Sequence, residues 1–331
     1  MNIVIHRYNN ICEPDFIRAF ETLGLTVIED REEMTRKSIP GEERIRTMGT
    51  LILEQHPLFV FTVNFFPYIS EICERLHVLY LSATTDCPVE EIFDPAIRNA
   101  CNRVFLFDGE QYRAVRDENP DRIFHLPLGV DTERIDGEIG AFADFCGHEQ
   151  YDCDLSFVGS LYNEPHRKPE DRETSRERID LLNALAAGLP EYRVHLYTRS
   201  DTAALHGVVC HGGVKTHGEM PAVFRRSRVN LHTTMRDIRT GLPQRIWDVL
   251  GSGGFLLSNA QAEIPDYLQI GKHLDVWEDE REAIEKTRWW LAHEEERQEI
   301  ARAGYLEVRA HHRVLDRVVT MMQLSLGEDR R

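Results

Sequence analysis

Apolar residues in the first 130 positions form short runs that alternate with amphipathic stretches. Leu58–Val63 is apolar on both faces, which is typical of a strand in a parallel sheet that helices cover on each side. In Asp15–Leu23 the apolar residues recur at the i, i+3, i+4, i+7 spacing of one buried helix face. The pattern predicts strands at Asn2–His6, Thr26–Glu29, Leu58–Val63, Val78–Leu81, Arg103–Phe107 and Arg122–Leu128. It predicts helices at Asp15–Leu23, Glu42–Gln55, Pro67–Arg75, Pro95–Ala100 and Glu110–Arg116. This half is therefore expected to be a doubly wound α/β domain.

A polar stretch punctuated by glycines, residues 129–152, interrupts this alternation and predicts a linker. A second alternation follows, and Asn163–Arg178, dense in charge and proline, is expected to be an exposed loop entering a helix. The predicted strands are Leu155–Val158, Arg193–Thr198, Val229–Thr233, Phe255–Ser258 and His273–Trp277. The predicted helices are Arg176–Ala187, Glu219–Arg226, Pro243–Leu250 and three closing helices between Glu280 and Leu326. We expect two Rossmann-like domains, 1–135 and 153–308, with a linker at 136–152 and a C-terminal helix and tail at 309–331.

The overall charge narrows the classes of partner. The 331 residues include 56 acidic and 39 basic ones, so the formal net charge is −17. Such a surface repels phosphate backbones and anionic lipid, which argues against nucleic acid or a membrane surface as the main partner. Seven cysteines without a Cys-x-x-Cys pair favour a reducing compartment, and no apolar run is long enough to span a bilayer. No signal peptide is visible, so a cytoplasmic protein without an integral membrane segment is expected.

The stretch from Thr240 to Ser258 is the most informative for chemistry. A Gly-Leu turn precedes Pro243, which suits the first position of a helix whose N-terminus would cradle a diphosphate. Arg239 and Arg245 flank it with cationic donors, and Asp248 lies two turns along, where a carboxylate would accept hydrogen bonds from a ribose. The candidate donor-binding residues here are Arg239, Gly241, Leu242, Pro243, Arg245 and Asp248. The alternative is an ordinary strand–turn–helix unit without a ligand.

This stretch, with Gln261–Pro265 after it, resembles the donor-site signature of CgeB-like glycosyltransferases of the GT-B superfamily. The first half is similar to the uncharacterised domain that commonly precedes CgeB-like domains. The matching stretches are Ile11–Asp15, Phe61–Pro67 and Asn102–Asp108, with a GT-B-like strand-and-linker junction at Leu126–Arg134. The resemblance implies two facing Rossmann-like domains with a cleft between them, and a C-terminal helix that closes back toward the N-terminal domain.

The resemblance also assigns roles to individual residues. It implies that Asp248 stands where donor domains of this superfamily carry a ribose-binding glutamate, and that Gly159 and Ser160 approach the donor phosphates. Lys215 and Thr216 match a loop near the base and phosphates; a solvated loop lysine is the alternative for Lys215. Thr240 stands where many retaining enzymes carry a glutamate, so inversion and retention both stay open.

Three polar residues at predicted strand ends are candidates for the acceptor side. Asp86 follows Val78–Leu81 at the carboxyl end of the sheet, where ligands bind in open α/β folds, and is the candidate general base. Its alternative is a cap for a helix after Pro88. Arg7 and Asn64 follow the first and third strands and would bind acceptor or donor phosphate, or else satisfy local backbone groups.

These features together predict a metal-independent glycosyltransferase that moves a sugar, with a UDP-sugar as the expected donor, to an acceptor hydroxyl. The nucleotide sugar is a co-substrate, and no cofactor is expected. The Asp-x-Asp pair at Asp152 and Asp154 is expected to be a solvated strand start and not a metal site. The alternatives are a nucleotide-sugar epimerase on the same scaffold and a non-catalytic nucleotide-sugar-binding protein. The acceptor is left open between polysaccharide, protein and small metabolite.

Overall fold

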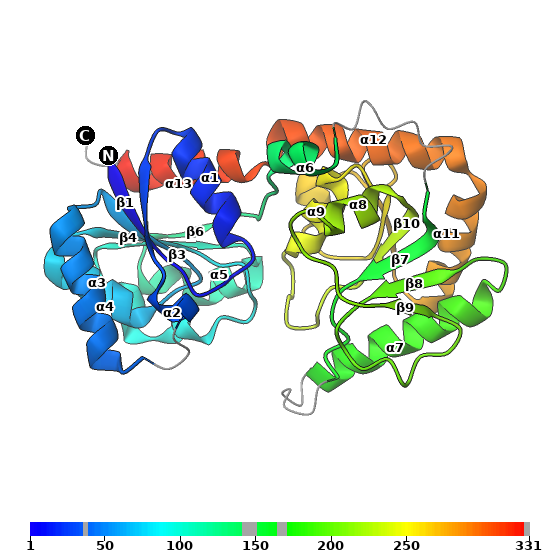
Figure 1. Ribbon diagram of the computed structural model, residues 1–331, viewed down its shortest axis with the longest axis horizontal. Helices are drawn as coiled ribbons and strands as arrows, with labels where there is room; N and C mark the ends of the chain where they lie inside the picture. The colour runs from blue at the N-terminus through cyan, green and yellow to red at the C-terminus, as the bar shows by residue number, and fades with distance from the viewer. Residues whose placement is uncertain (36–38, 141–150, 164–170, 328–331) are drawn as a thin grey trace. The chain divides into compact units, whose positions relative to one another are not determined.

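A computed structural model describes residues 1–35, 39–140, 151–163 and 171–327 of the chain. The contacts divide these residues into two compact units. The first unit comprises 1–129, 237–242 and the C-terminal segment from 313; the second comprises 130–236 and 243–312. Each unit contains one six-stranded parallel sheet with helices on both faces (Figure 1). The predicted α/β architecture is confirmed.

The sheet of the first unit has the strand order β2-β1-β3-β4-β5-β6. Its strands are β1 (Asn2–His6), β2 (Thr26–Asp30), β3 (Phe59–Val63), β4 (Leu79–Ala83), β5 (Asn102–Leu106) and β6 (Ile123–His125), which confirms all six predictions. Its helices are α1 (Glu13–Thr22), α2 (Glu32–Thr35), α3 (Gly41–Gln55), α4 (Pro67–Leu76), α5 (Gly109–Val115) and α13 (Val314–Leu326). Short 3₁₀ turns occupy Glu90–Phe93, Pro95–Arg98 and Arg116–Glu118.

Strand β3 explains why this sheet is covered on both faces. All five of its residues are buried, and alternate side chains point to opposite sides. Val60 lies in the core beneath α3 and α4, whereas Phe61 packs with Phe16 of α1 and Val318 of α13. The C-terminal helix α13 therefore belongs to the first unit, where it lies beside α1 (Figure 1). This confirms the prediction that the end of the chain returns to the N-terminal domain.

The sheet of the second unit has the order β12-β11-β10-β7-β8-β9. Its strands are β7 (Cys153–Val158), β8 (Val194–Tyr197), β9 (Val209–His211), β10 (Ser227–His232), β11 (Leu256–Asn259) and β12 (Asp275–Trp277). Its helices are α6 (Thr132–Ile139), α7 (Asp171–Gly188), α8 (Met220–Arg225), α9 (Gln244–Gly251), α10 (Ile264–Tyr267), α11 (Glu280–Ala292) and α12 (Glu294–His311). None of the helices in the described residues is both long and apolar enough to cross a membrane.

Several elements of this unit differ from the sequence prediction. Strand β9 was not predicted, because it is a half-exposed three-residue edge strand. Helix α6 begins within the glycine-rich stretch; Asp131 caps it by accepting the N–H of Arg134 at 2.9 Å. Helix α7 begins at Asp171, so residues 171–175, predicted as part of a loop, are helical. The predicted linker and loop residues at 141–150 and 164–170 lie outside the described residues.

Candidate functional site

The carboxyl ends of β3 and β4 bring Asn64 and Asp86 together in the first unit. Asn64 adopts a left-handed backbone with φ of 60°, which asparagine tolerates better than most residues. Its Oδ1 accepts the backbone N–H groups of Thr85 and Asp86 at 3.0 and 3.3 Å. Its Nδ2 donates to Asp86 Oδ2 at 2.6 Å. Asp86 is exposed, and the following turn has Val89 at its N-cap with no side-chain cap, so Asp86 does not serve as a helix cap.

The cluster is completed by Tyr8 and Asn10, which follow β1 and were not predicted from the sequence. Asn64 Nδ2 also donates to the Tyr8 hydroxyl at 2.8 Å, and Asn10 Nδ2 donates to the same oxygen at 3.2 Å. Burial, and then the nearby charge of Asp86, raise the pKa of Tyr8 well above its ordinary value. Tyr8 is therefore a neutral phenol. Tyr8 lies two residues beyond the first strand, and this position is the feature of the sequence by which it could have been predicted.

Arg7 does not join this cluster. Its guanidinium pairs with Glu13 at 3.0 Å and with Glu29, and its side chain is only 14% exposed. Glu13 itself is completely buried. The Arg7 charge is thus neutralised inside the first unit.

Residues 239–241 bind an internal anion. Asp108 Oδ2 accepts the consecutive backbone N–H groups of Arg239, Thr240 and Gly241 at 2.9–3.0 Å. Successive N–H groups of this kind form an anion-binding concavity. A Cβ on Gly241 would lie 2.7 Å from the Phe107 carbonyl oxygen, so this close approach requires glycine. The anion that Gly241 holds here is a carboxylate of the chain itself; the Arg239 side chain is exposed, and Leu242 is buried.

A buried arginine joins two loops at the carboxyl ends of β7 and β10 in the second unit. Arg178 of α7 donates to the Ser160 carbonyl at 2.6 Å and to the hydroxyl and carbonyl of Thr233 at 2.9 and 2.7 Å. Its guanidinium lies 4.8 Å from the centroid of the Tyr162 ring. The loop of Gly159 and Ser160 is held in this way. Arg178 lies where the predicted loop Asn163–Arg178 enters the predicted helix Arg176–Ala187, and its contacts to Ser160 and Thr233 were not predicted.

The start of α9 carries Arg245 and Asp248. Asp248 accepts Gln244 Nε2 at 3.1 Å and Arg245 Nη1 at 3.3 Å. Burial raises the pKa of Asp248 above its ordinary value, although the Arg245 charge opposes this. Burial, then Arg178 and Arg245, hold the pKa of His232 far below its ordinary value, so His232 is neutral. Pro243 is the N-cap of α9 and not its first helical residue, which corrects the predicted start by one position.

The loop before α8 carries Lys215 and Thr216. Lys215 is 76% exposed, and its Nζ lies 3.6 Å from Glu219 Oε1, an exposed pair of small energetic weight. Thr216 is half-buried on the same loop. The Asp-x-Asp residues Asp152 and Asp154 pair with arginines at 3.3 and 3.1 Å. In the described part of the chain, no three His, Cys, Asp or Glu side chains gather as a metal site.

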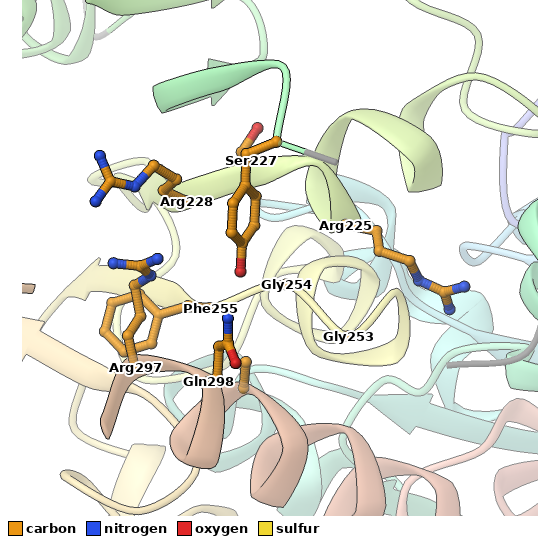
Figure 2. A pocket seen from close by; sticks show the side chains of 10 residues that line it. Arg225, Ser227, Arg228, Gly253, Gly254, Phe255, Arg297 and Gln298 are labelled. Atoms are coloured by element: carbon orange, nitrogen blue, oxygen red, sulfur yellow. The ribbon is translucent and has the colours of Figure 1, made fainter. Parts of the chain in front are cut away.

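A separate pocket in the second unit lies at the amino ends of its strands, where Arg228 follows the first residue of β10 and Phe255 precedes β11 (Figure 2). The guanidinium of Arg297 is buried there and donates to the Trp290 carbonyl at 2.6 Å. The cavity measures about 10 Å³, which is room for about one water molecule. It is too small for a nucleotide sugar.

Comparisons with known proteins agree with this architecture. Residues 172–323 match the glycosyl transferase-like family, and a search of curated proteins finds no match. A glycosyltransferase from Rickettsia africae has 9% identity and a TM-score of 0.71, covering 100% of this chain and 99% of that one. Anabaena HepE, solved with UDP and glucose, has 11% identity, a TM-score of 0.63 and coverage of 100% of both chains. A putative UDP-N-acetylglucosamine 2-epimerase from Listeria monocytogenes has 12% identity, a TM-score of 0.61 and coverage of 99% and 97%.

At such identities the structural likeness establishes the fold, and the CgeB-like assignment of both halves stays a prediction. The family match begins in α7 and ends in α13, so it includes Arg178, Arg245 and Asp248. The protein has the GT-B fold, and its residues 172–323 are glycosyl transferase-like in sequence.

Proposed function

We propose that the protein is a glycosyltransferase, of the CgeB-like type, that transfers a hexose from a nucleotide diphosphate to an acceptor hydroxyl. The observation that carries the proposal is the glycosyl transferase-like sequence of 172–323, which contains Arg178, Arg245 and Asp248 of the second unit. UDP is the proposed nucleotide, since HepE has been solved with UDP and with UDP-glucose. The described cysteines form no disulfide with one another, which supports a cytoplasmic location.

The donor is proposed to bind the second unit at the carboxyl ends of β7 and β10. There Arg245 would contact the diphosphate and Asp248 would accept from the ribose hydroxyls, with its own geometry set by Gln244. The loop of Gly159 and Ser160 would approach the phosphates. Lys215 and Thr216 would contribute once Lys215 leaves its exposed partner Glu219, and Pro243 completes the proposed set in the second unit.

Fixed cations are proposed to stabilise the departing diphosphate in place of a metal ion. Arg245 supplies one such charge, and it is already oriented by Asp248 at 3.3 Å. The proposal therefore requires no cofactor and no divalent cation.

Asp86 is proposed to be the general base. Its carboxylate would take the proton of the acceptor hydroxyl while that oxygen bonds to the anomeric carbon. The bond from that carbon to the phosphate oxygen breaks, and its electron pair leaves with UDP. Asp86 suits this role because it is exposed and Asn64 holds only one of its two oxygens.

The first test is calorimetric titration of the full chain with UDP, UDP-glucose, UDP-N-acetylglucosamine, ADP-glucose and GDP-mannose, each with magnesium and with EDTA. We expect micromolar binding of one UDP-sugar, unchanged by EDTA and weakened at least tenfold by Arg245→Gln. The matched control is Arg281→Gln, since Arg281 is 85% exposed and lies in an ordinary helix pair. A folded protein that binds none of these ligands would contradict the proposal.

Product analysis separates the alternatives. A transferase releases UDP and couples the sugar to an acceptor or to water, whereas an epimerase changes the sugar configuration without needing an acceptor. Binding without either product would indicate a nucleotide-sugar-binding protein.

A further inference from the structure

Hydrogen bonds around Tyr8 determine the orientation of two asparagine amides. Asn64 Oδ1 faces the backbone N–H groups of Thr85 and Asp86, so Nδ2 must be the atom that faces Asp86 and Tyr8. Asn10 Oδ1 faces the N–H of Cys12 at 2.9 Å, so its Nδ2 must face Tyr8. Neither amide can be flipped without setting its NH₂ group against backbone N–H donors.

The Tyr8 oxygen therefore accepts two N–H groups, one from each asparagine. A phenol oxygen has two acceptor sites and one proton. With both acceptor sites in use, the Tyr8 proton must be donated outward, and no acceptor for it exists among the residues that the structure describes. Burial and the Asp86 charge raise the pKa of Tyr8, which keeps that proton in place.

Asp86, which accepts from the same asparagine as Tyr8, offers an acceptor where Tyr8 offers a donor. Its Oδ2 accepts from Asn64, while Oδ1 has no hydrogen-bond partner in the described part of the chain. Tyr8 and Asp86 thus accept from the same amide nitrogen, at 2.8 and 2.6 Å, and present one donor and one acceptor side by side. A group that both accepts and donates a hydrogen bond would pair with the Tyr8 O–H and with the Asp86 carboxylate at the same time.

We propose that Tyr8 and Asp86 together bind the acceptor hydroxyl, with the Tyr8 O–H donating to its oxygen and Asp86 accepting its proton. This inference rests on the proposed glycosyltransferase function and defines the acceptor class as a neutral hydroxyl. An ammonium group has no lone pair for Tyr8, and a carboxylate would be repelled by Asp86. In the transfer step the hydroxyl proton passes to Asp86 and Tyr8 keeps its own proton, so Tyr8 orients the nucleophile without supplying a charge.

The first arm of the test needs no turnover. A crystal structure of the full chain at about 1.5 Å, grown without glycerol and then soaked with it, should show one oxygen within hydrogen-bond distance of both Tyr8 Oη and Asp86. That oxygen belongs to water before the soak and to a glycerol hydroxyl after it. The inference is overturned if Tyr8 Oη donates to a protein atom, or if no oxygen bridges the pair in either crystal.

The second arm measures UDP release from UDP-glucose, with water and glycerol as the acceptors, and UDP affinity by calorimetry. Tyr8→Phe keeps the ring, which packs edge-on to Phe66 at 5.2 Å, and removes only the donor. We expect UDP release to fall about tenfold, the value of one hydrogen bond of about 1.4 kcal/mol, with UDP affinity unchanged. Tyr112→Phe is the control, because Tyr112 stacks on His125 in the same unit.

The outcomes of the two arms are separable. If the wild-type protein neither binds UDP nor consumes UDP-glucose, the proposed function fails, and the crystals alone decide whether Tyr8 and Asp86 hold a hydroxyl. If wild type is active and Tyr8→Phe matches it, the inference fails and the proposed function stands.

Discussion

Substituting Asp108 tests how the chain holds residues 239–241. One oxygen of this buried carboxylate accepts the N–H groups of Arg239, Thr240 and Gly241, and the other accepts those of Glu110 and Gln111 at 3.0 and 2.9 Å. Asp108 is thus both the N-cap of α5 and the anchor of the 239–241 segment. In Asp108→Asn only one side of the amide is an oxygen, so the N–H groups on its other side lose this acceptor. These are the three of residues 239–241, or else those of Glu110 and Gln111, of which the Glu110 N–H keeps the Thr240 hydroxyl at 3.2 Å.

The number of N–H groups that lose an acceptor determines the expected loss of unfolding free energy. A buried donor left without an acceptor costs about 1–3 kcal/mol, and hydrogen bonds to a charged group are worth about 1.5–3 kcal/mol each, not additively. We therefore expect Asp108→Asn to lower the free energy of unfolding of the first unit by about 3 kcal/mol. Asp94→Asn is the matched control, because Asp94 accepts a single N–H, that of Ala96 at 2.9 Å, and asparagine caps as well as aspartate. It should cost less than about 0.5 kcal/mol.

Urea unfolding and hydrogen exchange provide the assay. Burial alone would raise the pKa of Asp108, but the N–H groups of Gly241, Thr240, Gln111 and Arg239 hold it below its ordinary value. The stabilisation is therefore present above the unfolded pKa of about 3.9 and is lost as the pH falls through the folded pKa. The difference between wild type and Asp108→Asn should be constant from pH 6 to 8 and shrink below about pH 4. The reasoning is refuted if wild type and Asp108→Asn have equal unfolding free energies at pH 7 and the amides of 239–241 in the variant are still protected from hydrogen exchange.

Three further predictions concern single residues. Burial alone would lower the pKa of His6, but its hydrogen bonds to Asp30 and Glu33 raise that pKa to about 9. The stability that a charged His6 gives the folded protein is therefore complete below about pH 6.5 and is lost as the pH rises through 9. The stability gap between wild type and His6→Gln in urea should therefore be smaller at pH 10 than at pH 6, and a constant gap would count against a charged His6. Arg178→Met should lower the unfolding free energy of the second unit by about 2–4 kcal/mol, because two carbonyls and a hydroxyl lose their donor. A melting temperature like that of wild type would show that Arg178 does not hold the two loops together. Gly304→Ala should destabilise although alanine favours helices by about 1 kcal/mol, since its Cβ would lie 2.4 Å from the His273 oxygen; a raised melting temperature would show that the backbone yields there.

Hydrophobic pattern was sufficient for most of the fold. Runs such as Leu58–Val63 became strands buried on both faces, because only a sheet covered by two helix layers removes both sides from water. Elements with weak patterns were missed. Strand β9 is short and half-exposed, and α6 begins among glycines, where a cap at Asp131 decides the helix.

The sequence alone indicated which strand ends carry polar side chains, and the pairing of β3 with β4 in the parallel sheet placed Asn64 beside Asp86. Tertiary structure decided how those side chains are used. Arg7 turned to Glu13 and Glu29, the N–H groups of 239–241 turned to Asp108, and Arg178 came from a charged stretch to join two loops. These partners are separated by up to 133 residues in the chain, and a hydrogen bond depends on distance and direction in space. Periodicity reports which face of an element is buried, whereas the partner of a polar group is determined only when distant loops meet.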